Sequence, residues 1–123
     1  MSTLNVSNIS DGTTTVGTSY VVNGSAKAWV NFNGTGTIAA RDSFNTSSLT
    51  DIGTGEYSQT FTSSMSNNGY SLTGGISESG VGGQARIVLG DGYTTTASLI
   101  LSYNTTTRTD YQFIAATLNG DLA

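Results

Sequence analysis

The acidic side chains are the first candidates for chemistry in this chain, which has eight Asp and Glu residues. Two carboxylates that flank a glycosidic bond can hydrolyse it, provided that an apolar setting raises the pKa of one of them. Each candidate instead follows or precedes a glycine, a turn or an arginine, as solvated turn carboxylates do. We therefore expect no catalytic residue and no enzyme. The candidates are Asp42, Asp51, Glu56, Asp91 and Asp110.

Metal and cofactor chemistry lacks its usual ligands, because the chain has no cysteine and no histidine. Zinc, haem and iron–sulfur sites depend on those side chains, and so do Cys–His and Ser–His relays. A calcium site needs a dense set of oxygen ligands, and the EF-hand spacing is absent. Asp11, Asp51 or Asp91 with nearby carbonyls remains the alternative for a hard cation. We expect no metal site and no cofactor.

Two aromatic residues could contact a sugar. Trp29, the single tryptophan, is interpreted as a core or subunit-seam residue, with a carbohydrate-stacking platform as the alternative. Tyr93 follows Asp91 and Gly92 and precedes three threonines, so it would place an aromatic ring in a polar loop. It is the better candidate for sugar binding, although an ordinary loop tyrosine would look the same.

The composition favours β-structure. Thr, Ser, Asn and Gly make up 64 of 123 residues, and only 10% of the residues are charged. Few Glu–Lys pairs are available to support exposed helices, whereas Thr, Tyr, Val and Ile suit a pleated sheet. With 36% hydrophobic residues, a single domain of this length would have a thin core. We expect identical subunits to share additional buried surface in a closed symmetric oligomer.

The charge of the chain argues against two classes of partner. The net charge is −4 and the four basic residues are dispersed. Nucleic acid binding needs clustered Lys and Arg, and an acidic surface is repelled by anionic membranes. We expect neither nucleic acid binding nor membrane insertion. Arg41 with Asp42 and Arg108 with Asp110 are interpreted as intersubunit or cross-strand ion pairs.

The first half of the chain divides into an arm and the start of a sheet. Residues 1–24 have isolated apolar residues in a polar run, which predicts an extended attachment arm, with a disordered terminus as the alternative. A strand-like pattern begins at Ser19, and Asn23-Gly24 is expected to form a tight turn. Residues 26–32 alternate as in a half-buried strand, and residues 38–44 are expected to return as a second strand. Residues 45–56 are expected to form a polar connection.

The second half is expected to form a meander of strands. The pattern predicts strands at 69–76, 85–89, 97–103 and 109–118, with a glycine-rich loop at 80–83 and a hairpin turn at Asp91-Gly92. Both faces of the last two strands carry apolar residues, which indicates a sheet placed between its partner sheet and another subunit. The fold class is therefore all-β, an antiparallel β-sandwich of the jelly-roll or lectin type spanning residues 25–123. The subunit-seam candidates are Trp29, Phe32, Phe44 and Phe113.

Motifs over residues 5–70 resemble a specific family. The block KAWVNFNGTG…RDSFN…SSLTD…GTGEY…FTSSM, preceded by DGTTTV…SYVVNGSA, resembles a module of tail-fibre and appendage proteins of bacteriophages, particularly marine ones. A more distant resemblance, to H-type-lectin-like fibre tips, rests on TTTASLILS and on the spacing D-x-x-F-x-x-A-x-L-N-G from Asp110 to Gly120. Where that family has a tryptophan in the final strand, this chain has Phe113 and Ile114.

The resemblance implies a non-enzymatic structural protein exposed on the phage particle. It would be a homotrimeric tail-fibre component that attaches to another virion protein through its arm and contacts a host surface glycan or protein. The missing basic and apolar regions of an export signal at the N-terminus fit release by lysis. A capsid decoration or head-fibre protein that stabilises the capsid remains the alternative. The receptor-binding candidates are Asp91, Tyr93, Asn104 and Arg108.

Overall fold

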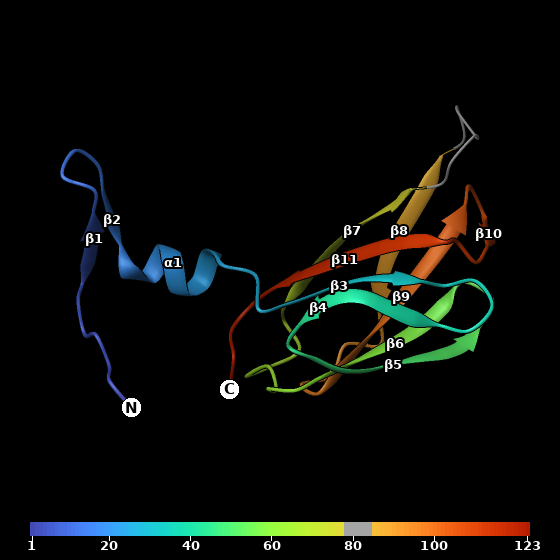
Figure 1. Cartoon of the computed structure of the whole chain (residues 1–123), viewed down its shortest axis with the longest axis horizontal. Coiled ribbons are helices and arrows are strands. Elements are labelled where there is room, and N and C mark those ends of the chain that lie inside the picture. Colours follow the sequence, from blue (N-terminus) through green and yellow to red (C-terminus); the bar gives the residue numbers. More distant parts are fainter. Residues whose placement is uncertain (78–84) are drawn as a thin grey trace.

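Two antiparallel sheets form the body of the computed structural model, which describes residues 1–77 and 85–123 (Figure 1). The glycine-rich loop expected at 80–83 lies outside the described residues. Sheet 1 has the order β4-β3-β11-β7, and sheet 2 has the order β5-β6-β9, with β8 and the short β10 also paired to β9. The bounds are β3 Ala28–Asn33, β4 Ala39–Phe44, β5 Thr46–Gly53, β6 Glu56–Phe61, β7 Ser71–Ser77, β8 Arg86–Asp91, β9 Ala97–Asn104, β10 Thr107–Arg108 and β11 Phe113–Asn119. The expected all-β sandwich is confirmed.

Side-chain alternation builds the core between the two sheets. In β3, Ala28, Val30 and Phe32 are buried, and the residues between them face outward. In β6, Tyr57 and Phe61 are buried in the same way. The Phe32 and Tyr57 rings meet edge to face, with 5.0 Å between their centroids. This aromatic contact therefore joins the two sheets at the centre of the core.

The two sides of the sandwich differ in how closely the sheets approach. On one side, β7 packs directly on β8, and a Cβ atom at Gly74 would lie 2.5 Å from Val88 Cγ1 and 2.6 Å from the Ala115 carbonyl oxygen. Only glycine permits this approach. On the other side, β4 and β5 are edge strands of different sheets, joined through Asn45, which has a φ of 53°. The sandwich is thus closed along β7 and β8 and more open along β4 and β5.

The N-terminal arm differs from the expected extended segment. It contains the hairpin of β1 (Asn8–Ser10) and β2 (Thr15–Gly17), followed by the helix α1 (Thr18–Gly24). The predicted strand start at Ser19 and the turn at Asn23-Gly24 are wrong, because both lie within α1. The local sequence does not favour this helix: it has β-branched Val21 and Val22, no side-chain cap and no acidic residue in its first turn.

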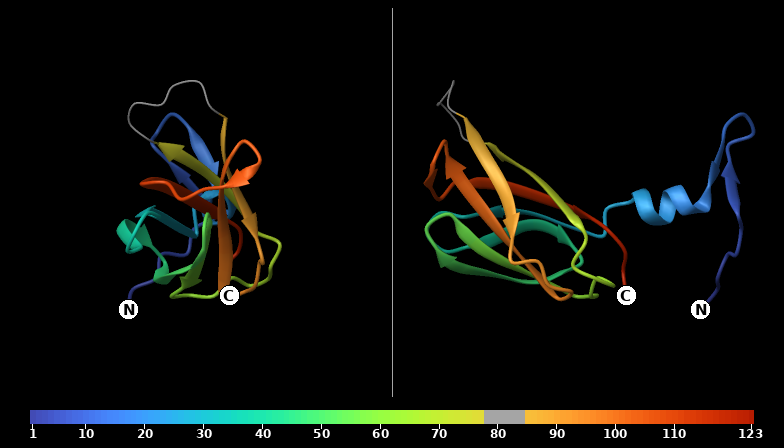
Figure 2. Two further views of the ribbon diagram at one scale, coloured as in Figure 1. Left: turned by 90° about the vertical axis from the view of Figure 1, so that its right-hand side faces the viewer. Right: turned by 180° about the vertical axis from the view of Figure 1, so that it is seen from behind.

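The arm projects from one end of the sandwich, which we call the arm end (Figures 1 and 2). At its base, the Lys27 N–H donates to the Leu118 carbonyl at 2.8 Å, and Asn119 Nδ2 donates to the Gly24 carbonyl at 3.2 Å. No residue of α1 is buried. In the described residues, no helix is long and apolar enough to cross a membrane.

Two further expectations need correction. Residues 45–56 were expected to be a polar connection, but residues 46–53 form β5, an edge strand that is exposed along most of its length. Its only inward-facing large apolar residue is Leu49, so the apolar alternation that marks a strand is missing.

Phe32 was expected at a subunit seam, but it is fully buried inside the chain and has no surface to offer another subunit.

Candidate functional site

The four predicted receptor-binding residues lie at two ends of the sandwich. Asp91 pairs with Leu99 near the beginning of β9, whereas Arg108 pairs with Tyr103 near its end. Leu99 and Tyr103 are four positions apart, so Asp91 and Arg108 are separated by roughly 13 Å along β9, at about 3.3 Å per residue. Asp91 and Tyr93 lie at the arm end. Asn104 and Arg108 lie at the opposite end, which we call the distal end (Figure 1). The four residues therefore do not form one site.

Tyr93 is not a free ring in a polar loop. Its ring lies 4.8 Å from that of Tyr70, measured between centroids, and joins the core cluster at the arm end. A Cβ atom at Gly90 would clash with the Tyr93 hydroxyl, so the ring covers this glycine. Burial, and then the charge of Asp91, raise the pKa of Tyr93. The ring is therefore part of the edge of the core and is poorly placed to stack on a sugar.

The carboxylates at the distal end hold structure together. Arg108 forms an ion pair with Glu56 instead of the expected Asp110, and its Nε lies 3.3 Å from the Tyr103 hydroxyl. Asp110 Oδ1 accepts hydrogen bonds from the Tyr57 hydroxyl at 2.8 Å and from the Gly55 N–H at 2.7 Å. Burial and the Asp110 carboxylate raise the pKa of Tyr57. Within the described residues, no three potential metal-binding side chains come together.

The other three seam candidates share the outer face of sheet 1. Trp29 and Phe44 are directly opposite each other on β3 and β4, and Phe113 lies on β11 toward the distal end. Trp29 is half-buried, whereas Phe44 and Phe113 are 53% and 38% exposed. Polar side chains such as Asn31 and Thr117 lie between them on this face. The outer face of sheet 1 therefore combines separated aromatic rings with hydrogen-bonding groups, which suits a ligand better than a continuous subunit seam.

A groove of about 270 Å³ crosses this outer face beside Phe113. Small residues form its floor, and a Cβ atom at Gly75 would meet nothing within 4 Å. Polar and aromatic side chains form its walls. The lining residues are Asn31, Gly75, Ile76, Ser77, Phe113 and Ala115, from β3, β7 and β11.

A β-bulge places Arg41 in contact with two residues that line this groove, Asn31 and Phe113. The register shifts between two successive pairs, Asn31 with Asp42 and Phe32 with Ala40, so that Arg41 is the extra residue of β4. Its guanidinium carbon lies 4.0 Å from the centroid of the Phe113 ring. Its Nη2 donates to the Gln112 carbonyl at 2.7 Å and its Nη1 to Asn31 Oδ1 at 3.4 Å. Within the chain Arg41 and Asp42 form no ion pair, so the cross-strand alternative is wrong, and the intersubunit alternative stays a prediction.

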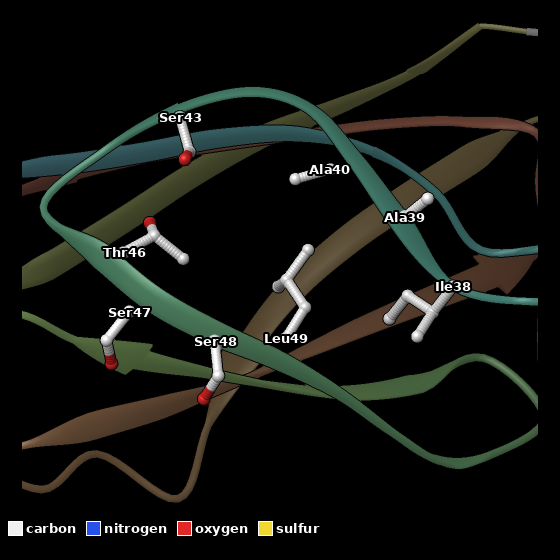
Figure 3. Close-up of a pocket in the computed structure, with 8 residues that line it drawn as sticks. All are labelled: Ile38, Ala39, Ala40, Ser43, Thr46, Ser47, Ser48 and Leu49. Carbon is white, nitrogen blue, oxygen red and sulfur yellow. The ribbon is translucent and has the colours of Figure 1, made fainter.

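A second cavity, of about 320 Å³, lies between β4 and β5 on the open side of the sandwich (Figure 3). Ile38 and Leu49 extend into the space between the strands, whereas Ser47 and Ser48 point to the other side of β5. The Thr46 hydroxyl accepts a hydrogen bond from Gln59 Nε2 at 2.7 Å. The lining has no charged or aromatic side chain, so this cavity offers less for recognition than the groove at Phe113.

Sheet 2 has a contiguous apolar outer face, which we call the aliphatic face. Leu89 is opposite Leu101, and Ile87 is opposite Tyr103. Ile87 and Leu89 are 40% and 47% exposed. The ion pair of Arg108 and Glu56 borders the face at the distal end. An apolar centre with a charged rim is typical of a protein–protein interface.

Comparisons of the chain with protein-family models, curated proteins and solved structures found no match. Its function is therefore inferred from the residues and their geometry.

Proposed function

We propose that this chain is a non-enzymatic structural protein of a phage particle, a tail-fibre or appendage component that contributes to host surface recognition. The motif resemblance over residues 5–70 supports this function. The arm supplies the physical support, because its apolar side chains have no cover within the chain: Tyr20 is 76% and Val22 61% exposed. An ordered segment with exposed apolar residues at one end of a domain suits attachment, and it leaves the distal end directed away from the attachment point.

A test of attachment replaces exposed apolar residues of α1. The double variant Tyr20→Ser and Val22→Ser should lower the number of copies per purified particle at least about tenfold, since buried aromatic and apolar anchors dominate interface energies. The matched control replaces exposed apolar residues of the sandwich, Phe44→Ser and Ile52→Ser. Copies per particle are counted by quantitative mass spectrometry of the virus that encodes the chain.

Equal incorporation of both double variants would show that the arm is not the attachment segment. Absence of the wild-type chain from particles would remove the proposed function altogether. Imaging the particles separates the two locations: density on the tail supports the appendage function, whereas density on the shell supports the alternative, a capsid decoration or head-fibre protein.

We also propose that copies of the chain associate through the aliphatic face, as a trimer. Leu89→Asp should raise the dissociation constant of the oligomer about tenfold or more, because it buries an unpaired charge. Thr73→Asp is the control, since Thr73 is exposed on the outer face of sheet 1. Sedimentation velocity over a dilution series measures the effect. A wild-type chain that stays monomeric at every concentration, or equal effects of the two variants, would contradict this seam.

A further inference from the structure

We propose that the groove at Phe113 binds a carboxylate-bearing sugar residue of an acidic polysaccharide, with Arg41 as the group that recognises the carboxylate. This inference deepens the proposed function, on which it rests, by naming the ligand class. Three features support it: the charge of Arg41 beside the groove, which forms no ion pair within the described residues, the spare hydrogen-bonding groups of the walls, and the open floor at Gly75.

The charge of Arg41 is the first feature. The described part of the chain contains no ion pair to this guanidinium, although the chain has twice as many acidic as basic residues. Two of its five N–H donors are directed to Gln112 and Asn31, so others remain for a ligand. Stacking on Phe113 fixes the guanidinium plane, which lowers the entropy lost on binding. A fixed guanidinium binds carboxylates and phosphates in a bidentate manner, and the carboxylate is the group that an acidic sugar residue carries.

The charges around Arg41 limit its attraction for an anionic ligand to short range. Asp42 is its neighbour in sequence and is paired with Asn31, so the net charge nearby is close to zero. The chain as a whole carries −4. A diffuse polyanion is therefore not attracted, and only a carboxylate that contacts the guanidinium directly gains a charge-assisted hydrogen bond.

The walls suit the hydroxyl groups of a sugar. Asn31 uses its Oδ1 for Arg41, and in the described residues its Nδ2 makes no hydrogen bond. The Ser77 hydroxyl likewise makes none there. Phe113 supplies an apolar surface for the C–H groups of the ring, and Gly75 and Ala115 leave room above the sheet. The volume of about 270 Å³ lies below the usual range for drug-sized ligands and suits one or two sugar rings.

The test measures binding of oligogalacturonate to the full chain by calorimetry and amide NMR. Arg41→Gln should weaken binding about tenfold or more, as expected for loss of one charge-assisted interaction. Arg86→Gln is the matched control: it removes the same charge from a residue on sheet 2 whose guanidinium carbon lies 5.2 Å from the centroid of another ring, that of Tyr111, and binding should change less than about twofold. In the wild type, the amide shifts should centre on Gly75, Ser77 and Ala115.

A second variant blocks the groove without removing charge. Gly75→Val should abolish measurable binding, because the valine side chain fills the space that the sugar would occupy. The fold should be retained, since a Cβ atom at Gly75 meets nothing within 4 Å and the φ of this residue is not in the left-handed region. Carboxyl-reduced oligosaccharide should bind at least about tenfold more weakly than the acidic form.

Three results would overturn the inference: equal losses in Arg41→Gln and Arg86→Gln, undiminished binding of the carboxyl-reduced form, or amide shifts located away from the groove. Its failure is separable from failure of the proposed function, since particle attachment is tested through α1. If the chain is incorporated into particles through its arm but does not bind oligogalacturonate, only the proposed ligand class is wrong.

Discussion

Phe32→Ala is expected to lower the free energy of unfolding by about 3–5 kcal/mol, which is a large part of the total stability of a small domain. Phe32 is fully buried between the sheets, and its ring meets Tyr57 at a centroid distance of 5.0 Å. Truncation leaves a cavity that rigid strands on both sides cannot close. Denaturant unfolding of the full chain, followed by circular dichroism, measures the loss.

Phe44→Ala is the matched control for this prediction. It makes the same truncation at a side chain that is 53% exposed and should cost less than about 1 kcal/mol. If the two variants lose the same stability, Phe32 is not at the centre of the core, and the two sheets do not pack around its ring.

Gly55→Ala is expected to be the most damaging of the glycine substitutions. Gly55 has a φ of 63°, which costs other residues about 1–2 kcal/mol. A Cβ atom there would also lie 2.5 Å from the Ser102 carbonyl oxygen and 2.7 Å from the Thr109 nitrogen, both backbone atoms that cannot rotate away. The strands must move apart to make room for the methyl group, which should raise the loss of stability by a further amount of about 1–3 kcal/mol. The same movement weakens the hydrogen bond from the Gly55 N–H to Asp110.

Gly36→Ala isolates the backbone contribution. Gly36 has nearly the same φ, 62°, but a Cβ atom there meets nothing within 4 Å. The Gly36→Ala variant should lose only the stability that the left-handed backbone conformation costs a non-glycine residue, about 1–2 kcal/mol. Thermal and denaturant unfolding of both variants measures the difference, and equal losses would mean that the close approach of β10 to the turn at Gly55 does not constrain the fold.

The sequence predicted the parts of the fold in which one face of a strand is buried. Residues 26–32 alternate clearly, and Ala28, Val30 and Phe32 are the buried set of β3. The edge strand β5 lacks this signal because most of its side chains face solvent. The helix α1 was missed because Val21 and Val22 favour a strand and nothing buries either side of the segment.

The contacts at the candidate site join residues that are far apart in the chain, so they could not be predicted from the sequence. Arg108 and Glu56 are 52 residues apart, so the nearer Asp110 was the obvious partner. The position of Arg41 depends on one extra residue in β4, which shifts the register and turns its side chain toward Phe113. Phe113 was predicted as a subunit-seam residue, but its neighbours in the groove, Gly75 and Asn31, come from two other strands.

The irregular pairing of β4 with β3 and of β5 with β6 has a consequence for concentrated solutions of this chain. Both are edge strands, and an exposed regular edge is a template for uncontrolled strand addition between chains. The register of β4 is broken at Arg41, and that of β5 is broken between Thr46 and Ser48 and again between Asp51 and Gly53. Bent, charged edges resist such addition. Many copies at high local concentration should therefore remain soluble units instead of merging into fibrils.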